Sequence, residues 1–385
     1  MRSILGGFFI VLLVVANVVT AVVLWSMVSD VQQVSAALQQ EPTPDSFLLP
    51  EPTVAGQPTP LPTPVTVIEP TATLPPTATP APVPPPTETP APLPTATPPP
   101  PAAEVAAANL PPPTASARPN TEYVVIISID GLRPDALFLA HTPTLDSLIE
   151  RGAYSPNAQT LPLSVTLPSH ASMLSGMTPA KHGIEWGLPY IGWPGMNGPT
   201  VFSVAHNAGL KTAMVFGKEK LSYIALPGSV DFLFGQDVHD PEVKDRAIEA
   251  IVTDMPHLLF VHFPDTDRVG HTYGWMSENQ LQSIAYADGL IGEIVAALEQ
   301  QGYLERALII VTADHGGHGM GHGDDSPEDR TIPWLAAGPQ VRPGVSLTGA
   351  INTYDTAATA LYALNLPVPE VWDGRPVREA FLPAP

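Results

Sequence analysis

Residues Tyr123–Gly131 read YVVIISIDG, a run rich in valine and isoleucine that ends at an aspartate and a glycine. β-Branched residues in an unbroken apolar run predict a buried strand. In open α/β sheets, ligand sites form outside the carboxyl ends of such strands. We therefore expect Asp130 to stand at a functional edge of a sheet.

Strand and helix patterns alternate through the 265 residues that surround and follow this run, from Thr121 to Pro385. This order is typical of α/β folds with a mainly parallel sheet flanked by helices. Further strands are predicted at 211–216, 257–262 and 307–312. Helices are predicted at 143–151, 201–208, 241–253 and 278–301. Thr142 is the expected N-cap of the first helix, because Pro143 suits the first helical position.

The N-terminus carries a long apolar segment. Ser3 to Ser29 is a run of 27 uncharged residues, and a helix of that length reaches about 40 Å, enough to cross a bilayer with some tilt. A secretory signal has an apolar core of only about 7–15 residues, so residues 1–30 predict an uncleaved transmembrane anchor. Arg2 precedes the run and Asp30 follows it. The positive-inside rule then predicts a single-pass protein of the cell membrane with its folded domain outside the cytoplasm.

A proline-rich stretch separates this anchor from the α/β pattern. Of the 49 prolines in the chain, 27 fall between Glu41 and Asn120, mostly among threonine and alanine. Such a sequence has too little apolar surface to offset the entropy of ordering it. We expect residues 31–120 to form a disordered, polyproline-leaning stalk and residues 121–385 to form the folded α/β domain.

Charge and cysteine content exclude several classes of function. Residues 121–385 contain 14 Lys and Arg against 30 Asp and Glu, a net charge of −16 with neutral histidines. Nucleic-acid binding surfaces are basic, so we expect none here. The chain has no cysteine. Disulfides, thiolate metal ligands and cysteine nucleophiles are therefore excluded.

Four short clusters carry the residues with catalytic chemistry. They are Asp130-Gly131, the segment TLPSH that begins at Thr166, the segment DRVGH that begins at Asp267, and Asp314-His315 followed by GGHGMGHG. Each cluster alone is as consistent with a helix cap or a structural histidine as with a ligand. Together, three carboxylates and three or four histidines close behind predicted strands form the ligand set expected for paired Zn²⁺ or similar ions without thiolates.

With these clusters in this order, residues 124–381 resemble the alkaline phosphatase superfamily, specifically its type I phosphodiesterase/nucleotide pyrophosphatase branch. The resemblance implies that Asp130, Asp314 and His315 hold one metal ion beside Thr166, the nucleophile. It implies that Asp267 and His271 hold a second ion with a later histidine. Only His318 and His322 follow His315, and we favour His322.

Two further features bear on the substrate. Diesterase relatives place an asparagine about five residues after the histidine of a His-Gly-Ile element, and Gly187 stands there in this chain. The segment GKEK at 217–220 is similar to a lysine-containing segment that contacts phosphate in some monoesterase members, which makes Lys218 and Lys220 candidate substrate-binding residues. Solvated charges after a strand explain the same lysines equally well. His170 and His182 are expected to buttress the nucleophile helix.

The resemblance implies a metal-dependent phosphodiesterase or nucleotide pyrophosphatase with two divalent ions, a phosphothreonine intermediate and a small phosphate-ester substrate. A phosphomonoesterase or an envelope head-group phosphotransferase of the same fold is an alternative. A catalytically silent, metal-stabilised surface binding protein is another. A sulfatase is disfavoured, because Thr166 stands at the position of the modified Cys or Ser and His170 at the position of the expected arginine.

Overall fold

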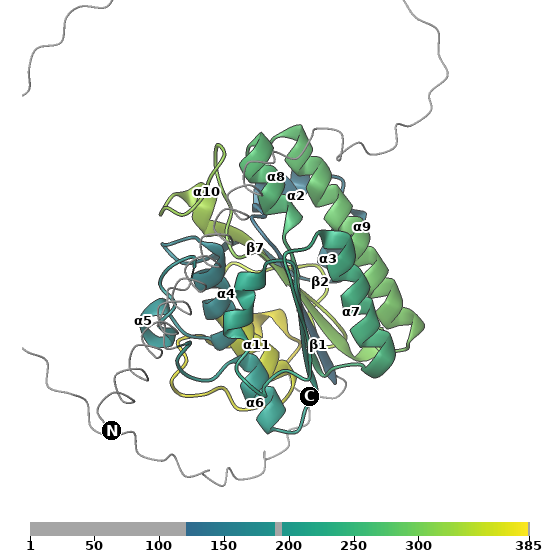
Figure 1. Ribbon diagram of the computed structural model, residues 1–385. Helices are drawn as coiled ribbons and strands as arrows, with labels where there is room; N and C mark the ends of the chain where they lie inside the picture. The colour runs from purple at the N-terminus through teal and green to yellow at the C-terminus, as the bar shows by residue number, and fades with distance from the viewer. Residues whose placement is uncertain (1–120, 189–194, 384–385) are drawn as a thin grey trace, which may run out of the picture. The chain divides into compact units, whose positions relative to one another are not determined.

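The computed structural model describes residues 121–188 and 195–383 (Figure 1). The predicted anchor at 1–30 and the predicted stalk at 31–120 lie outside the described residues.

An eight-stranded sheet forms the middle of the described domain. Strand β1 (Tyr123–Ile129) lies at its centre, between β5 (Leu258–Phe263) and β6 (Ala307–Thr312), and is parallel to both. The full strand order is β4-β3-β5-β1-β6-β7-β2-β8. The other strands are β2 (Gly152–Gln159), β3 (Thr212–Phe216), β4 (Phe232–Gly235), β7 (Thr331–Ala337) and β8 (Val345–Ser346).

The prediction of a mainly parallel sheet is confirmed, since only β7 runs against its neighbours. The apolar strands β1, β3, β5 and β6 lie within one residue of their predicted bounds. Strands β2, β4, β7 and β8 were not predicted from the sequence; β4 has only four residues and β8 only two. Strand β2 (GAYSPNAQ) is interrupted by polar residues and a proline, and β7 contains Pro333, so neither shows an uninterrupted strand pattern.

Helices cover both faces of this sheet (Figure 1). One layer packs around the long helix α9, and the other packs around α4 and α11. The first layer contains α2 (Pro134–Leu139), α3 (Pro143–Glu150), α7 (Asp240–Asp254), α8 (Asp265–Tyr273) and α9 (Glu278–Gln300). The second contains α4 (Thr166–Ser175), α5 (Pro179–His182), α6 (Val201–Asn207) and α11 (Asp355–Ala363). Helix α10 (Pro327–Arg330) precedes β7.

Helix α9 shows why hydropathy alone does not identify a membrane span. Among the described helices it alone is long and apolar enough to cross a bilayer. Its apolar residues, however, pack into the core between α7, α8 and α3. It also buries Asp288, whose carboxylate accepts hydrogen bonds from the backbone N–H groups of Thr144 (3.0 Å) and Leu145 (2.7 Å). Asp288 therefore caps α3.

The prediction that Thr142 is the N-cap residue of α3 is confirmed. Its side chain, however, makes no capping bond, and the hydroxyl instead donates to the carbonyl of Leu137 at 3.3 Å. A buried carboxylate from a helix that is distant in sequence takes over the two free N–H groups.

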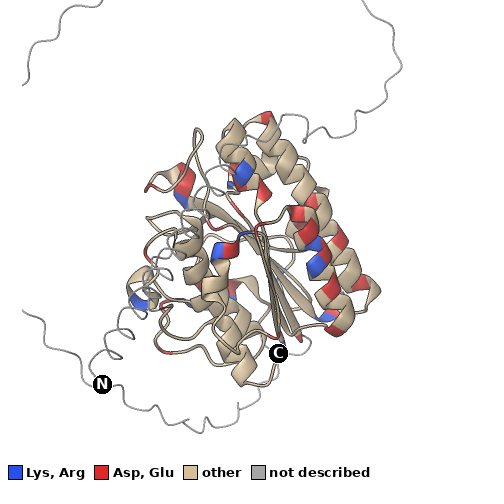
Figure 2. Ribbon diagram, viewed as in Figure 1, with Lys and Arg blue, Asp and Glu red and all other residues tan. Residues whose placement is uncertain are grey.

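Acidic residues outnumber basic ones along the outer helices α7 and α9 (Figure 2). This distribution agrees with the net charge of the domain. Two basic residues just after β3, Lys218 and Lys220, lie at the candidate site described below.

Candidate active site

Four neighbouring strands, β3, β5, β1 and β6, bring the predicted site residues together. Asp130 directly follows β1, and Asp314 and His315 follow β6 after one residue. Asp267 and His271 lie on α8, which begins just after β5, and Lys218 lies two residues beyond β3. Because all four strands are parallel, their carboxyl ends meet at one edge of the sheet.

The first group of potential metal ligands contains Asp130, Asp314 and His315, all fully buried. His315 Nε2 lies 3.3 Å from Asp130 Oδ1 and 3.2 Å from Asp314 Oδ2. The same nitrogen lies 3.4 Å from Thr166 Oγ1. The structure therefore places the predicted nucleophile beside these three residues.

The second group gathers around Asp267. His271 Nε2 lies 3.4 Å and His322 Nε2 lies 3.5 Å from the same oxygen, Asp267 Oδ1. His322 stacks on His315, with ring centroids 3.6 Å apart and planes 13° apart. The two groups are therefore adjacent.

All three histidines present Nε2 to the site and use Nδ1 to hold their orientation. Nδ1 donates to a backbone carbonyl in each case: Gly316 for His315 (2.8 Å), Met320 for His271 (3.0 Å) and Ser164 for His322 (2.7 Å). Metal-binding histidines commonly show this arrangement, because the carbonyl selects the tautomer with a free Nε2.

His318, the alternative to His322, lies elsewhere. Its Nδ1 is 2.8 Å from Asp329 Oδ1, and half of its side chain is exposed. With Asp324 it forms a separate surface cluster. The stretch after Asp314 contains two histidines four residues apart, and the turn between them places only His322 beside Asp267.

Lys218 bridges the two groups. Its Nζ lies 2.7 Å from Asp130 Oδ2 and 2.5 Å from Asp267 Oδ2. Burial alone would lower the pKa of Lys218, but these two carboxylates raise it. The ammonium group therefore stays charged between the two carboxylates.

The carboxylates differ in their proton affinity. Burial alone would raise the pKa of Asp130, but the Lys218 charge and a hydrogen bond from His262 hold it well below its usual value. Burial and the nearby charge of Asp130 raise the pKa of Asp314 well above its usual value. Three carboxylates around one ammonium attract further positive charge.

Buried side-chain oxygens without hydrogen-bond partners indicate whether cations would fit this site. Asp130 Oδ1, Asp314 Oδ2 and Asp267 Oδ1 are buried and accept no hydrogen bond from any described residue. Buried carboxylate oxygens without partners are costly, and coordination of a cation removes that cost. These oxygens belong to the two Asp/His groups, so the residues present fit divalent ions.

Helix α4 begins at Thr166, the predicted nucleophile. His170 Nδ1 donates to the Thr166 carbonyl at 2.8 Å, and its Nε2 accepts from the Ser128 hydroxyl at 2.9 Å. His182 lies 2.9 Å from the Ser172 hydroxyl, and burial lowers its pKa to about 4. Both histidines hold α4 in place, as expected.

Trp275 is the first of two residues that shape the site and were not predicted from the sequence. Trp275 donates from Nε1 to the carbonyl of Gly131 (2.9 Å) and lies edge-on to His271. Gly131 has φ of +73°, and a Cβ there would come within 3.3 Å of Asp267 and Trp275. The sequence around Trp275 does not indicate these contacts, which only the three-dimensional neighbours reveal.

His262 is the second missed residue, interpreted in sequence only as part of strand β5. Its Nε2 lies 2.8 Å from Asp130 Oδ2, and its ring is fully buried. With Lys218 on the same oxygen, Asp130 is left with Oδ1 for a cation. A polar residue in an otherwise apolar strand was the one available signal.

We expect His262→Gln to weaken binding of a divalent ion by roughly 10–100-fold, because outer partners orient the ligating carboxylate. Titration of the metal-free full chain with Zn²⁺ against a chromophoric chelator would measure this. His257→Gln is the matched control, since His257 lies before the same strand, where Nδ1 accepts from the N–H of Lys211. Equal affinities in the two variants would contradict the orienting role.

A Cβ added at Gly187 would meet no described atom within 4 Å. Asn197, the asparagine ten residues after Gly187, packs against Gly183 and donates from its backbone N–H to the His182 carbonyl at 2.9 Å. Among the described residues, its side chain makes no hydrogen bond with the Asp/His groups.

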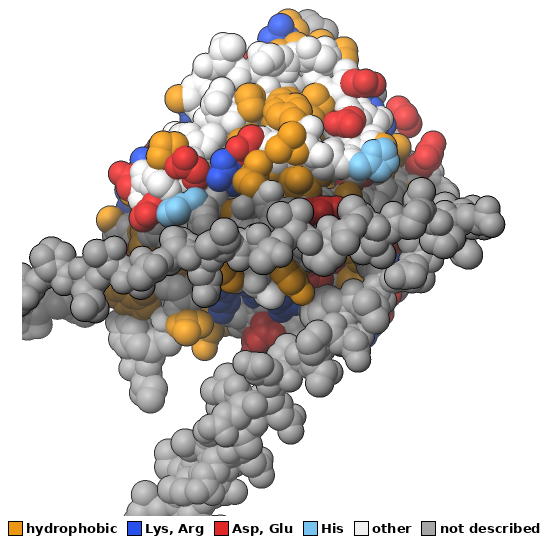
Figure 3. Space-filling model, turned by 90° about the horizontal axis from the view of Figure 1, so that it is seen from above, with side chains coloured by type: hydrophobic (Ala, Val, Ile, Leu, Met, Phe, Trp, Pro, Cys, Tyr) orange, Lys and Arg blue, Asp and Glu red, His pale blue; other side chains and the backbone are white. Residues whose placement is uncertain are grey.

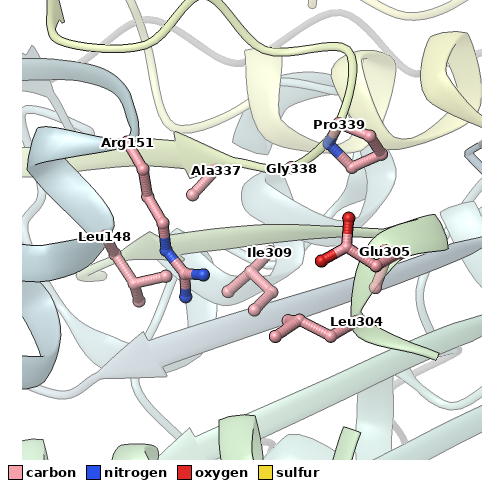
Figure 4. A pocket seen from close by; sticks show the side chains of 9 residues that line it. Leu148, Arg151, Leu304, Glu305, Ile309, Ala337, Gly338 and Pro339 are labelled. Atoms are coloured by element: carbon pink, nitrogen blue, oxygen red, sulfur yellow. The ribbon is translucent and has the colours of Figure 1, made fainter. Parts of the chain in front are cut away.

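The domain has two cavities of interest. One lies at the start of β6, and the other lies just beyond the end of β3. A cavity of about 210 Å³ lies at the start of β6, where Arg151 and Glu305 face each other above Leu148 and Ile309 (Figure 4). It is at the end of the sheet opposite the candidate site. A larger cavity of about 620 Å³ is lined by Lys218, Lys220 and Tyr223, next to the Asp/His groups.

Comparisons with known proteins agree with this geometry. The family model described as type I phosphodiesterase / nucleotide pyrophosphatase matches residues 124–185 and 189–363. An uncharacterized pyrophosphatase/phosphodiesterase of Schizosaccharomyces pombe is 30% identical over 215 residues, covering 50% of this chain and 44% of the relative. The catalytic subunit of human GPI ethanolamine phosphate transferase 2 is 27% identical over 300 residues, covering 70% of this chain and 29% of the relative.

These curated relatives are longer proteins, and the chain spans less than half of their length. Among solved structures, an inactive variant of murine ectonucleotide pyrophosphatase/phosphodiesterase 5 in complex with AMP superimposes with a TM-score of 0.59 at 15% identity. It covers 68% of this chain and all of that chain, which establishes the shared fold. The family match over more than half of the sequence shows that the chain belongs to the type I phosphodiesterase/nucleotide pyrophosphatase family.

Proposed function

We propose that the protein is a metal-dependent phosphodiesterase or nucleotide pyrophosphatase that hydrolyses small phosphate esters through a phosphothreonine intermediate. The observation that carries this proposal is the position of Thr166 Oγ1, 3.4 Å from His315 Nε2 and beside buried carboxylate oxygens without hydrogen-bond partners. The family is metal-dependent, and the two Asp/His groups supply oxygen and nitrogen ligands.

In this proposal the chain holds two divalent ions, and the ligand chemistry favours Zn²⁺. Asp130, Asp314 and His315 would hold one ion with Thr166. Asp267, His271 and His322 would hold the other. When bound, the ions would lower the pKa of the Thr166 hydroxyl, neutralise charge on the phosphoryl oxygens and stabilise the leaving oxygen.

Thr166 and helix α4 carry out the two steps of phosphoryl transfer in this proposal. Thr166 Oγ1 forms a bond to phosphorus while the ester bond to the leaving group breaks; the threonine proton passes to solvent, and the leaving oxygen takes up a proton from solvent. Water then cleaves the phosphothreonine, and Oγ1 recovers a proton. The first N–H groups of α4, which have no carbonyl partner within the helix, would donate to the phosphoryl oxygens.

A head-group phosphotransferase is the second candidate. The human GPI ethanolamine phosphate transferase 2 subunit is similar over 70% of this chain, which is more of the chain than the match with the yeast pyrophosphatase/phosphodiesterase covers. In that reaction an alcohol replaces water in attacking the phosphothreonine.

We also propose that the domain lies outside the cytoplasm on the predicted membrane anchor.

The test is an assay of the purified full chain with bis-p-nitrophenyl phosphate, p-nitrophenyl phosphate and ATP, with and without added Zn²⁺. We expect Zn²⁺-dependent release of nitrophenolate, faster from the diester than from the monoester. Added glycerol would increase turnover of a transferase by offering an alcohol acceptor. Silence on all three substrates with Zn²⁺ bound would contradict the proposal and favour the binding protein.

We expect Gly187→Asn to increase diester turnover by up to roughly tenfold, because a hydrogen bond to a charged group contributes about 1.5–3 kcal/mol. Among the described residues the side chain has room, since a Cβ at this position meets no described atom within 4 Å. Gly187→Ala is the matched control without an amide. Comparison of kcat/KM for bis-p-nitrophenyl phosphate would decide, and equal values for both variants would show that the amide is not used here.

A further inference from the structure

A cavity of about 620 Å³ lies beside the candidate site. We call it the Lys220 pocket; the residues that matter in its lining are Leu188, Lys218, Lys220, Tyr223, Asp237 and Arg268. The lysines and Tyr223 come from the segment after β3, which includes the short 3₁₀ helix η2 (Glu219–Ile224). Figure 3 looks onto the end of the domain where α8 and α10 lie, and it shows basic side chains there beside acidic and hydrophobic ones.

Lys218 connects the pocket to the reacting groups. It lines the pocket, and its Nζ contacts both Asp130 and Asp267. A phosphoryl group held at the Asp/His groups therefore has the Lys220 pocket as its neighbour on the β3 side. One substituent of the phosphorus can extend into it.

The three cationic side chains of the pocket differ in how many carboxylate or carbonyl partners they already contact. Lys218 is bound between two carboxylates. Arg268 donates to the carbonyls of Val238 (2.6 Å) and Gly217 (2.9 Å) and pairs with Asp265 at 3.1 Å. Lys220 has no hydrogen-bond acceptor or ion-pair partner among residues 121–188 and 195–383.

The surroundings of Lys220 favour an anion. Its side chain is half-buried, and burial together with the charge of Lys218 lowers its pKa. Two carboxylates, Glu219 and Asp237, also line the pocket, but both residues are exposed, and Asp237 already accepts from the backbone N–H of Glu219 at 3.0 Å. Solvent screens exposed carboxylates more strongly than a half-buried ammonium.

We propose that Lys220 is a specificity-determining residue that binds a second anionic group, a carboxylate or a phosphate, on the portion of the substrate that extends into the Lys220 pocket. This rests on the proposed function, because it assumes a phosphoryl group at the Asp/His groups. Leu188 and Tyr223, whose side chains are 70% and 47% exposed, supply apolar surface for the connecting part of the substrate. The preferred substrate is thus a phosphate ester with an additional negative charge.

Three product-like probes isolate the effect of a second negative charge on the substrate. Phenyl phosphate has the phosphoryl group alone, whereas 3- and 4-carboxyphenyl phosphate add a carboxylate at two distances. We would measure their dissociation constants by isothermal titration calorimetry on the Zn²⁺-loaded full chain. The better carboxylated probe is expected to bind at least about tenfold more tightly than phenyl phosphate, as one charge-assisted hydrogen bond allows.

Variants assign the effect to Lys220. Lys220→Gln is expected to abolish the tenfold preference while changing phenyl phosphate binding by less than about twofold, and Lys220→Arg is expected to restore most of the preference. Lys211→Gln is the matched control, because it removes the same charge at the opposite end of β3, where Lys211 pairs with Asp254 on the surface.

The outcomes separate this inference from the proposed function. Equal binding of all probes to the unmodified chain, or a preference that survives in Lys220→Gln, would overturn the role of Lys220 and leave the phosphoesterase proposal standing. Failure of every probe to bind the Zn²⁺-loaded chain would contradict the phosphoryl site itself and the inference with it.

Discussion

Replacing Thr166 by alanine is expected to reduce turnover of phosphate esters by at least about a thousandfold, because the variant has no hydroxyl to form the covalent intermediate. Thr166 Oγ1 lies 3.4 Å from Nε2 of His315, a member of the first group of ligands. Steady-state kcat with bis-p-nitrophenyl phosphate and Zn²⁺ measures the loss. The fold should survive, since the Oγ1 has no other hydrogen bond among described residues.

Two further variants sharpen this test. Thr166→Ser retains a hydroxyl and should retain measurable turnover. Ser169→Ala is the matched control, because it removes another buried hydroxyl of α4, one that accepts from Thr160 at 3.1 Å and lies outside the Asp/His groups. Full activity of Thr166→Ala would exclude the phosphothreonine mechanism. A phosphorylated Thr166 peptide in acid-quenched samples would support it independently.

The second large effect is expected for Asp267→Asn. The substitution keeps the shape of the side chain but removes the charge that faces His271 and His322 at 3.4 and 3.5 Å. An amide is a much weaker metal ligand than a carboxylate, so we expect loss of one of two ions and a decrease in kcat of roughly a hundredfold or more. Elemental analysis of the purified variant would show about one ion per chain in place of about two.

The histidines near Asp267 provide the control for this experiment. His322→Gln should reproduce the loss of one ion, whereas His318→Gln should retain both, because His318 pairs with Asp329 on the surface. Retention of two ions in Asp267→Asn would contradict the second site. The opposite result for the histidines would move the ligand role to His318.

Strands were predicted correctly from the sequence where they are unbroken apolar runs. Strands β1, β3, β5 and β6 are continuous apolar runs, and a run buried on both faces is visible in sequence. Strand β2 was missed, because it pairs with β7 through a register shift between Ser155 and Ala158 around Pro156. Its position depends on partners that are about 180 residues away.

The candidate site follows the same division. Asp130, Asp267, Asp314 and His315 could be identified, because each stands just behind a predicted strand and parallel strands place such residues at one edge. His262 could not, since a histidine within a strand gives no sign of which neighbour it will contact. The hydrogen bond from His262 to Asp130 depends on the pairing of β5 with β1.

By itself, the sequence determined the α/β class, the absence of thiolate chemistry and the acidic and histidine residues available as ligands, because composition and periodicity are local properties of the chain. Only the tertiary structure decided that His322 and not His318 faces Asp267, that Lys218 bridges two carboxylates and that Lys220 lines a cavity beside them. The ion-pair contacts among these join residues 49 to 88 positions apart in the sequence. Their geometry follows from strand order and loop packing, which no single stretch of the sequence encodes.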